Sequence, residues 1–240
     1  MGIGLLAQEE LYQMAEAADA TPYRSVGFVL GGLLVAATVW PMAGTIALAV
    51  LVVSVAVAPL ALPQPNFLLS LSATVVGAVY PTGLLGTLVL LREARGPWVD
   101  DGQAFWLVLM TFFVVWATDI FAYYVGKTWG QRKLAPAISP NKTWAGAIGG
   151  ATGAVLIATG FKLTVLPLLA WPHVLVVGLI AGVLGQMGDL TESQMKRSTG
   201  VKDASALLPG HGGLLDRFDS MVVAAPLIFV YLQTVARIIG

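Results

Sequence analysis

The chain has 240 residues, of which 57% are hydrophobic and 11% are charged, and its 13 basic and 13 acidic side chains leave no formal net charge. An ordinary soluble domain carries roughly 25% charged residues, so this composition predicts an integral membrane protein. The lack of cysteine excludes disulfides and zinc-thiolate sites, and the neutral balance argues against a nucleic-acid partner.

The first 24 residues are predicted to form a short amphipathic helix. Glu9, Glu10 and Glu16 alternate there with apolar side chains such as Leu11 and Tyr12. Such a pattern is typical of a helix that lies at the membrane interface or in solution. We therefore treat residues 1–24 as an N-terminal segment that precedes the membrane region.

Seven apolar segments follow, near the roughly 20 residues that a helix needs to cross a bilayer. Their Gly, Ala and Leu content suits helix packing rather than the alternation of a barrel strand. They are Ser25 to Trp40, Gly44 to Leu62, Phe67 to Leu91, Phe105 to Gly126, Thr143 to Gly160, His173 to Leu190 and Phe218 to Ile238. The expected fold is all-α: a polytopic transmembrane bundle of about seven spans, with N-terminal helices in residues 25–104 and a C-terminal catalytic region in 105–240. Pro81 and Gly83 predict that the third span is kinked or divided.

Basic residues indicate the orientation of these spans. The loops after Gly126 and Leu190 hold most of them and are predicted to lie on one side, which the positive-inside rule makes cytoplasmic. The basic residues on this side are Arg24, Lys127, Arg132, Lys133, Lys142, Lys196, Arg197, Lys202 and Arg217. The opposite side receives fewer: Arg92, Arg95, Lys162 and Arg237. The sequence therefore predicts a polar site that faces the cytoplasm.

Residues 189–219 are the most strongly charged stretch of this apolar chain. Asp189, Glu192, Ser193 and Lys196 are spaced so that a helix would present them on one face, where they would line a polar cavity. Carboxylates at a bilayer edge are costly unless they are paired, hydrated or bound to metal. This stretch is therefore the first place to look for chemistry.

Asp216 and Asp219 lie one helical turn apart at the start of the last span. Together with Asp189 they would give three converging carboxylates, which suit a hard cation such as Mg²⁺. The alternative is structural: Asp189 pairs with Lys196 or Arg197, and Asp216 pairs with Arg217, at solvated helix ends. Spacing alone leaves both interpretations open.

A glycine-rich turn, Pro209-Gly210-His211-Gly212-Gly213, comes directly before this last span. Backbone N–H groups in such a turn, with the dipole of the following helix, can bind a phosphate. Lys196, Arg197 and Lys202 would add the charge that a polyphosphate requires. An ordinary flexible loop with basic residues is the alternative.

At this point two blocks of sequence resemble the phosphatidate cytidylyltransferase, or CDP-diacylglycerol synthase, family. The first block comprises Ser193-Gln194-Met195-Lys196-Arg197, Lys202-Asp203-Ala204-Ser205 and Leu208-Pro209-Gly210-His211-Gly212-Gly213-Leu214-Leu215-Asp216-Arg217-Phe218-Asp219. The second comprises Asp119-Ile120-Phe121-Ala122-Tyr123-Tyr124-Val125-Gly126, Leu134-Ala135-Pro136 and Ser139-Pro140-Asn141-Lys142-Thr143-Trp144. Together they cover roughly the C-terminal half of the chain.

This resemblance implies a nucleotidyltransferase of phospholipid biosynthesis that joins CTP and phosphatidic acid into CDP-diacylglycerol and releases pyrophosphate. It implies Asp189, Asp216 and Asp219 as ligands of Mg²⁺, with a second cation such as K⁺ possible, and Lys196 with these aspartates as catalytic. The implied substrate-binding residues are Asp119, Lys142, Ser193, Arg197, Lys202, Asp203, His211 and Arg217. Spacing does not decide between a supporting, a cation-binding and a nucleotide-binding role for Asp119 and Asp203.

The resemblance also implies a homodimer in a bacterial cytoplasmic membrane, in contact with membrane lipid. Members of the family generally carry a further span before an acidic segment like Gln8 to Ala18, so a short or truncated form is expected here. A cation or proton-coupled transporter is a competing class, but its sites tend to lie at the membrane midplane. A CDP-alcohol phosphotransferase fits less well, since its aspartate motif is longer, and no GK[ST] loop indicates a common kinase.

Overall fold

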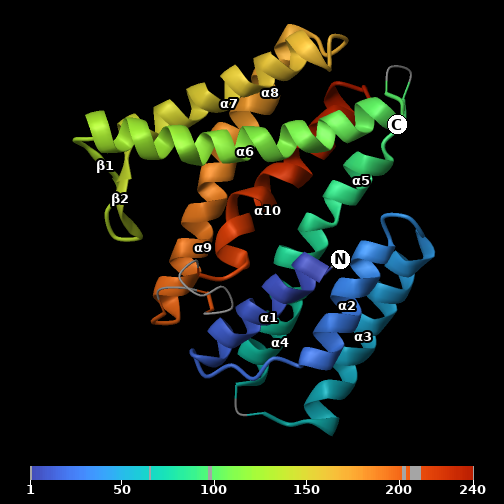
Figure 1. The fold of residues 1–240 in the computed structure, drawn as a ribbon. Coiled ribbons are helices and arrows are strands. Elements are labelled where there is room, and N and C mark those ends of the chain that lie inside the picture. The colour runs from blue at the N-terminus through green and yellow to red at the C-terminus, as the bar shows by residue number, and fades with distance from the viewer. Residues whose placement is uncertain (1, 65, 97–98, 202–203, 206–211, 240) are drawn as a thin grey trace. The chain divides into compact units, whose positions relative to one another are not determined.

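The computed structural model of this chain is almost entirely helical (Figure 1). It describes residues 2–64, 66–96, 99–201, 204–205 and 212–239. The helices are α1 (Gly2–Glu16), α2 (Arg24–Ala36), α3 (Met42–Ala61), α4 (Phe67–Gly77), α5 (Thr87–Glu93), α6 (Asp101–Trp129), α7 (Trp144–Thr164), α8 (Trp171–Leu179), α9 (Gln186–Ser198) and α10 (Leu215–Val230). Three π-helical stretches extend them: η1 (Ala78–Gly83), η2 (Ile180–Gly185) and η3 (Tyr231–Val235).

Among the described residues, five helices are long and apolar enough to cross a membrane. They are Phe67–Glu93, Asp101–Trp129, Trp144–Thr164, Trp171–Ser198 and Leu215–Val235. They match the last five predicted spans. The first two predicted spans correspond to α2, which has only 13 residues, and to α3, of which the stretch Met42–Ala58 is apolar. These five helices make the chain an integral membrane protein.

The predicted irregularity in the third span is a π-helical stretch rather than a break. Pro81 lies inside η1, between α4 and α5. Proline lacks an N–H and crowds the preceding turn, and a π-helical turn accommodates this without ending the helix. Apart from a turn at Gly86, the helix continues through to Glu93.

The chain forms two compact units, residues 1–89 with 194–218 and residues 90–193 with 219–240, so that α9 and α10 each give residues to both. In the first unit, α1 packs against α4 and η1. Its buried face carries Ala7, Leu11, Tyr12 and Met14, which form one apolar cluster with Leu215 of α10. The predicted N-terminal helix is therefore part of the core of this unit rather than a solvated segment.

In the second unit α6 and α7 run side by side (Figure 1). Glycines of α7 make this approach possible. A Cβ atom on Gly146 would lie 2.7 Å from the carbonyl oxygen of Ala122, and one on Gly150 would lie 2.8 Å from that of Thr118. Small residues at such spacing let helix backbones approach closely, as in other membrane bundles.

A short β-hairpin joins α6 to α7, which the expectation of a purely α fold did not include. Strands β1 (Lys133–Ala135) and β2 (Ser139–Thr143) pair antiparallel, with Lys133 opposite Thr143. The hairpin leads directly into α7, where the hydroxyl of Thr143 accepts a hydrogen bond from the Gly146 N–H (3.1 Å) and caps the helix. The part of the second sequence block that joins α6 to α7 thus has a defined local structure.

Candidate active site

Close packing of α9 against α10 brings two predicted carboxylates together in the second unit. A Cβ atom on Gly188 would lie 2.7 Å from the carbonyl oxygen of Asp219, so only glycine permits this approach without adjustment. Asp189 follows Gly188 directly on α9. The carboxylates of Asp189 and Asp219 interact electrostatically as a result.

Two further acidic side chains extend this pair. Asp219 also interacts electrostatically with Glu192, one turn beyond Asp189 on α9, and with Asp119 on α6. Glu192 is fully buried, with 0% exposure. Three acidic residues thus gather around Asp219, and we call the four together the acidic cluster: Asp119, Asp189, Glu192 and Asp219. Like charges at this density favour the binding of a cation.

Lys142 brings a positive charge to the acidic cluster. It lies near the end of β2, and its Nζ is 2.5 Å from Oδ2 of Asp189, with the two side chains 24% and 27% exposed. The hydroxyl of Ser193 lies 3.3 Å from the other oxygen, Oδ1, of Asp189 and donates to it. Asp119 also interacts with the charge of Lys142. Each oxygen of the Asp189 carboxylate therefore has a partner, Lys142 at Oδ2 and Ser193 at Oδ1.

A second group of predicted residues lies in the first unit. Nζ of Lys196 donates to Oδ1 of Asp216 at 2.6 Å, and the two side chains are only 13% and 14% exposed. Oδ2 of Asp216 accepts from the N–H groups of Gly213 (2.7 Å) and Ala204 (3.2 Å). A carboxylate held by one ammonium and two amides has a fixed position.

The structure thus brings together some predicted residues and not others. Asp119, Lys142, Asp189, Ser193 and Asp219 meet in one unit, whereas Lys196 and Asp216 meet in the other. Within the described residues, no three acidic or histidine side chains stand close enough to hold a metal ion by themselves.

The ion pairs of Asp189 and Asp216 differ from the pairs that the structural alternative predicted. Asp189 pairs with Lys142, and Asp216 pairs with Lys196. Arg197 and Arg217 are exposed on α9 and α10. Three further predicted residues, Lys202, Asp203 and His211, lie outside the described residues.

Glu10 is a residue that the sequence did not assign to the site. It is 2% exposed, and both of its carboxylate oxygens accept hydrogen bonds at the start of α10. A local signal for it exists: Glu10 falls at helical spacing with Ala7, Leu11 and Met14, on the apolar face of α1. A carboxylate on such a face needs a buried partner.

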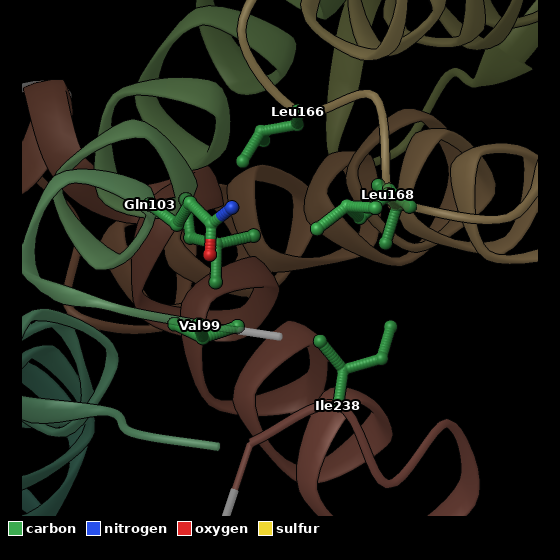
Figure 2. A pocket seen from close by; sticks show the side chains of 7 residues that line it. Val99, Gln103, Leu166, Leu168 and Ile238 are labelled. Atoms are coloured by element: carbon green, nitrogen blue, oxygen red, sulfur yellow. The ribbon is translucent and has the colours of Figure 1, made fainter. Parts of the chain in front are cut away.

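A pocket in the second unit contains none of these residues (Figure 2). Figure 2 shows Gln103 as a polar side chain among apolar ones, at the start of α6. The lining residues are Val99, Gln103, Leu107, Leu166, Leu168, Leu169 and Ile238. None of the residues of the acidic cluster lines this pocket.

These features define a helical integral membrane protein in which carboxylates of α6, α9 and α10 gather beside a lysine of β2. The chain matches the Cytidylyltransferase family over residues 1–235, and it belongs to that family. It is 50% identical over 135 residues to the phosphatidate cytidylyltransferase of Brucella melitensis, which is 55% of this chain and 48% of that protein. It is 48% identical over 119 residues to the enzyme of the same name from Bacillus subtilis, covering 50% and 44%. The match to that of Haemophilus influenzae is 42% over 131 residues, covering 53% and 46%.

The matched region thus spans about half the length of these curated relatives.

Proposed function

We propose that the chain is a phosphatidate cytidylyltransferase that converts CTP and phosphatidic acid into CDP-diacylglycerol and pyrophosphate. The observation that carries this proposal is the acidic cluster on apolar helices, with Lys142 beside it. Membership of the Cytidylyltransferase family and the names of the relatives support it. The site would face the cytoplasm, in a homodimer of about seven-span chains.

The residues present fit Mg²⁺. Carboxylate oxygens are the ligands that this ion prefers, and it is typically held by one or two carboxylates together with substrate phosphates. The Asp189–Asp219 pair matches that donor set. In this proposal Asp189 and Asp219 hold Mg²⁺ directly or through water, with room for a second cation such as K⁺. The role of Asp216 as a further ligand follows from the family resemblance alone. The ion would offset the negative charge of the reacting phosphates.

The basic side chains would neutralise and align two anionic substrates. A phosphate oxygen of phosphatidic acid attacks the α-phosphorus of CTP, the bond from that phosphorus to the bridging oxygen breaks, and pyrophosphate leaves. The lipid phosphate is already an anion near neutral pH, so the attack needs no strong general base. Lys142, Lys196, Arg197 and Arg217 would supply the positive charge that in-line transfer requires.

Predicted residues outside the described part of the chain complete the assignment. Lys202, Asp203 and His211 would contact the nucleotide or its phosphates, as Ser193 would from α9. Asp119 would position Lys142 or contact the nucleotide. These roles follow from the family resemblance of the two blocks.

The test is a direct assay of the purified protein in detergent or liposomes. It is supplied with radiolabelled CTP, phosphatidic acid and MgCl₂, and CDP-diacylglycerol and pyrophosphate are measured. We expect both products in equal amounts, and none when EDTA replaces MgCl₂. A folded protein that makes neither product would overturn the proposal.

A further inference from the structure

The carboxylate of Glu10 is bonded to the N-terminal end of α10. Its Oε1 accepts from the N–H of Leu214 (2.8 Å) and from the hydroxyl of Ser205 (2.6 Å), and its Oε2 accepts from the N–H of Leu215 (2.7 Å). The first N–H groups of a helix have no partner within the helix, and a negative charge there is favourable. Glu10 of α1 therefore caps α10 from a distant part of the sequence.

This carboxylate lies where the sequence placed a substrate phosphate. The N–H groups before α10 were expected to bind an anion, yet those of Leu214 and Leu215 donate to Glu10, and that of Gly213 donates to Asp216. A Cβ atom on Gly213 would lie 2.6 Å from Oε2 of Glu10, so the two are in close contact. At these three positions the N–H groups donate to carboxylates of the chain itself, and not to a phosphate.

Helix α1 holds Glu10 firmly in this place. The Gln8 amide donates to the hydroxyl of Tyr12 (2.7 Å) and accepts from the hydroxyl of Thr82 (2.7 Å), and all three side chains are buried. Leu215, with 0% exposure, packs in the same apolar cluster as Leu11 and Tyr12. Because these polar and apolar contacts hold α1 in place, the Glu10 carboxylate has a fixed position at the start of α10.

The cap acts on the residues that bear the proposed chemistry. Asp216 directly follows Leu215, and its carboxylate is held by Lys196, Gly213 and Ala204. We propose that Glu10 is a positioning residue. It fixes the start of α10 and thereby the orientation of the Asp216–Lys196 pair. Its effect on catalysis rests on the proposed function.

Three variants test this role through activity. Glu10→Gln keeps the size of the side chain but removes the charge, Glu10→Asp keeps the charge, and Glu16→Gln is the matched control on the same helix. Glu16 pairs with Arg24 and its side chain is 42% exposed. We expect Glu10→Gln to lower kcat by about 10–100-fold, as is typical when a partner of a metal-site ligand is removed.

The KM for CTP should not change if Glu10 acts through the start of α10, where both of its oxygens are bonded, and not on CTP itself. Glu10→Asp should recover part of the rate, and Glu16→Gln should match wild type. A lower KM for CTP or a faster rate in Glu10→Gln would show that Glu10 competes with a phosphate, which would overturn the proposal.

A second measurement does not depend on turnover. Hydrogen–deuterium exchange of the Leu214 and Leu215 amides is followed in the protein without CTP or Mg²⁺. Exchange should accelerate in Glu10→Gln and stay as in wild type in Glu16→Gln, because only the former removes the negative charge and one of the two acceptor oxygens at these amides. If Glu10→Gln does not fold, Glu10→Asp should give a smaller acceleration at the same amides.

Unchanged exchange at both amides in the Glu10 variants would refute the cap. The two proposals fail separately: absence of cytidylyl transfer by wild type refutes the function, whereas the exchange result alone decides whether Glu10 fixes the start of α10.

Discussion

The ammonium of Lys142 lies 2.5 Å from the carboxylate of Asp189, and this contact links the β-hairpin to α9 within one unit. The hairpin holds Lys142 in place, because Lys133 pairs with Thr143 in the strand register and Thr143 caps α7. A lysine in the middle of a flexible loop would lose side-chain and backbone entropy in making the same contact. The hairpin therefore makes Lys142 a preorganised cation beside the acidic cluster.

Replacement of Lys142 by methionine should impair catalysis strongly. The variant keeps the length of the side chain and removes the charge, so we expect kcat to fall by about 10²–10³-fold, as when one preorganised electrostatic contact to a transition state is lost. Initial rates of CDP-diacylglycerol formation at saturating CTP measure this. Lys162→Met is the control, since Lys162 donates to the carbonyl of Pro167 near the far end of α7. Equal losses in the two variants would contradict the role of Lys142.

Sequence patterns predicted the class of fold and the later spans well. Residues 105–126, 143–160, 173–190 and 218–238 were expected as membrane helices, and each overlaps a long apolar helix. Hydrophobicity over about 20 residues is a local property, and it sets these helices almost independently of the rest of the chain. The first two predicted spans illustrate the limit. Apolar composition alone did not reveal that α2 has only 13 residues.

The contacts of the site were harder to predict than its residues. The sequence singled out Asp119, Lys142, Asp189 and Asp219, but the only ion-pair partners that it offered for Asp189, in the structural alternative, were Lys196 and Arg197 and not Lys142. Helical spacing identifies neighbours three or four positions apart, whereas the partner of Asp189 comes from the hairpin before α7. Glu10 was missed for the same reason, because its partners, Ser205, Leu214 and Leu215, lie far from it along the chain.

Asp219→Asn should separate stability from function. Asp219 is an acidic side chain close to those of Asp119, Asp189 and Glu192, so its ionised form is repelled by theirs. Removing it relieves repulsion, so in EDTA the midpoint of thermal unfolding should rise by about 2–4 °C, the shift that about 1 kcal/mol produces in a chain of this size. Activity with Mg²⁺ should fall by about 10²-fold or more, because the charge opposing the cation is lost.

The control for this variant is Asp101→Asn. Asp101 pairs with Arg95 at the start of α6, and its side chain is 74% exposed. The Asp101→Asn variant should leave the rate unchanged and should not raise the unfolding midpoint. An Asp219→Asn protein that is both less stable and fully active would contradict the placement of Asp219 in the acidic cluster.

Gly188→Ala should destabilise the packing of α9 against α10. The new Cβ atom would meet the carbonyl oxygen of Asp219 at 2.7 Å and Cγ2 of Val223 at 2.9 Å, and a backbone atom cannot move aside cheaply. Overpacking of this kind costs about 1–3 kcal/mol.

Gly160→Ala is the matched control in α7, because its Cβ would meet nothing within 4 Å. It should be neutral or stabilising by up to about 1 kcal/mol, since alanine favours helix over glycine. Thermal unfolding of both variants in the same detergent decides the matter, and equal midpoints would refute the close approach.

Tyr12 should make the stability of the N-terminal helix depend on alkaline pH. Its side chain has 0% exposure, and its hydroxyl donates to the carbonyl of Thr74 at 2.9 Å. Burial raises the pKa of Tyr12 from 10.0 to about 12, since the phenolate would lose its hydration. Because the pKa is higher in the folded state, this stabilisation is complete below pH 10.0 and is lost as the pH rises toward about 12.

Tyr12→Phe cannot ionise, so its unfolding midpoint should be lower at pH 8, where the hydrogen bond is missing at a cost of about 1–3 kcal/mol. The difference from wild type should then shrink as the pH increases. Parallel curves for the two proteins across this range would show that Tyr12 is accessible to water in the folded chain.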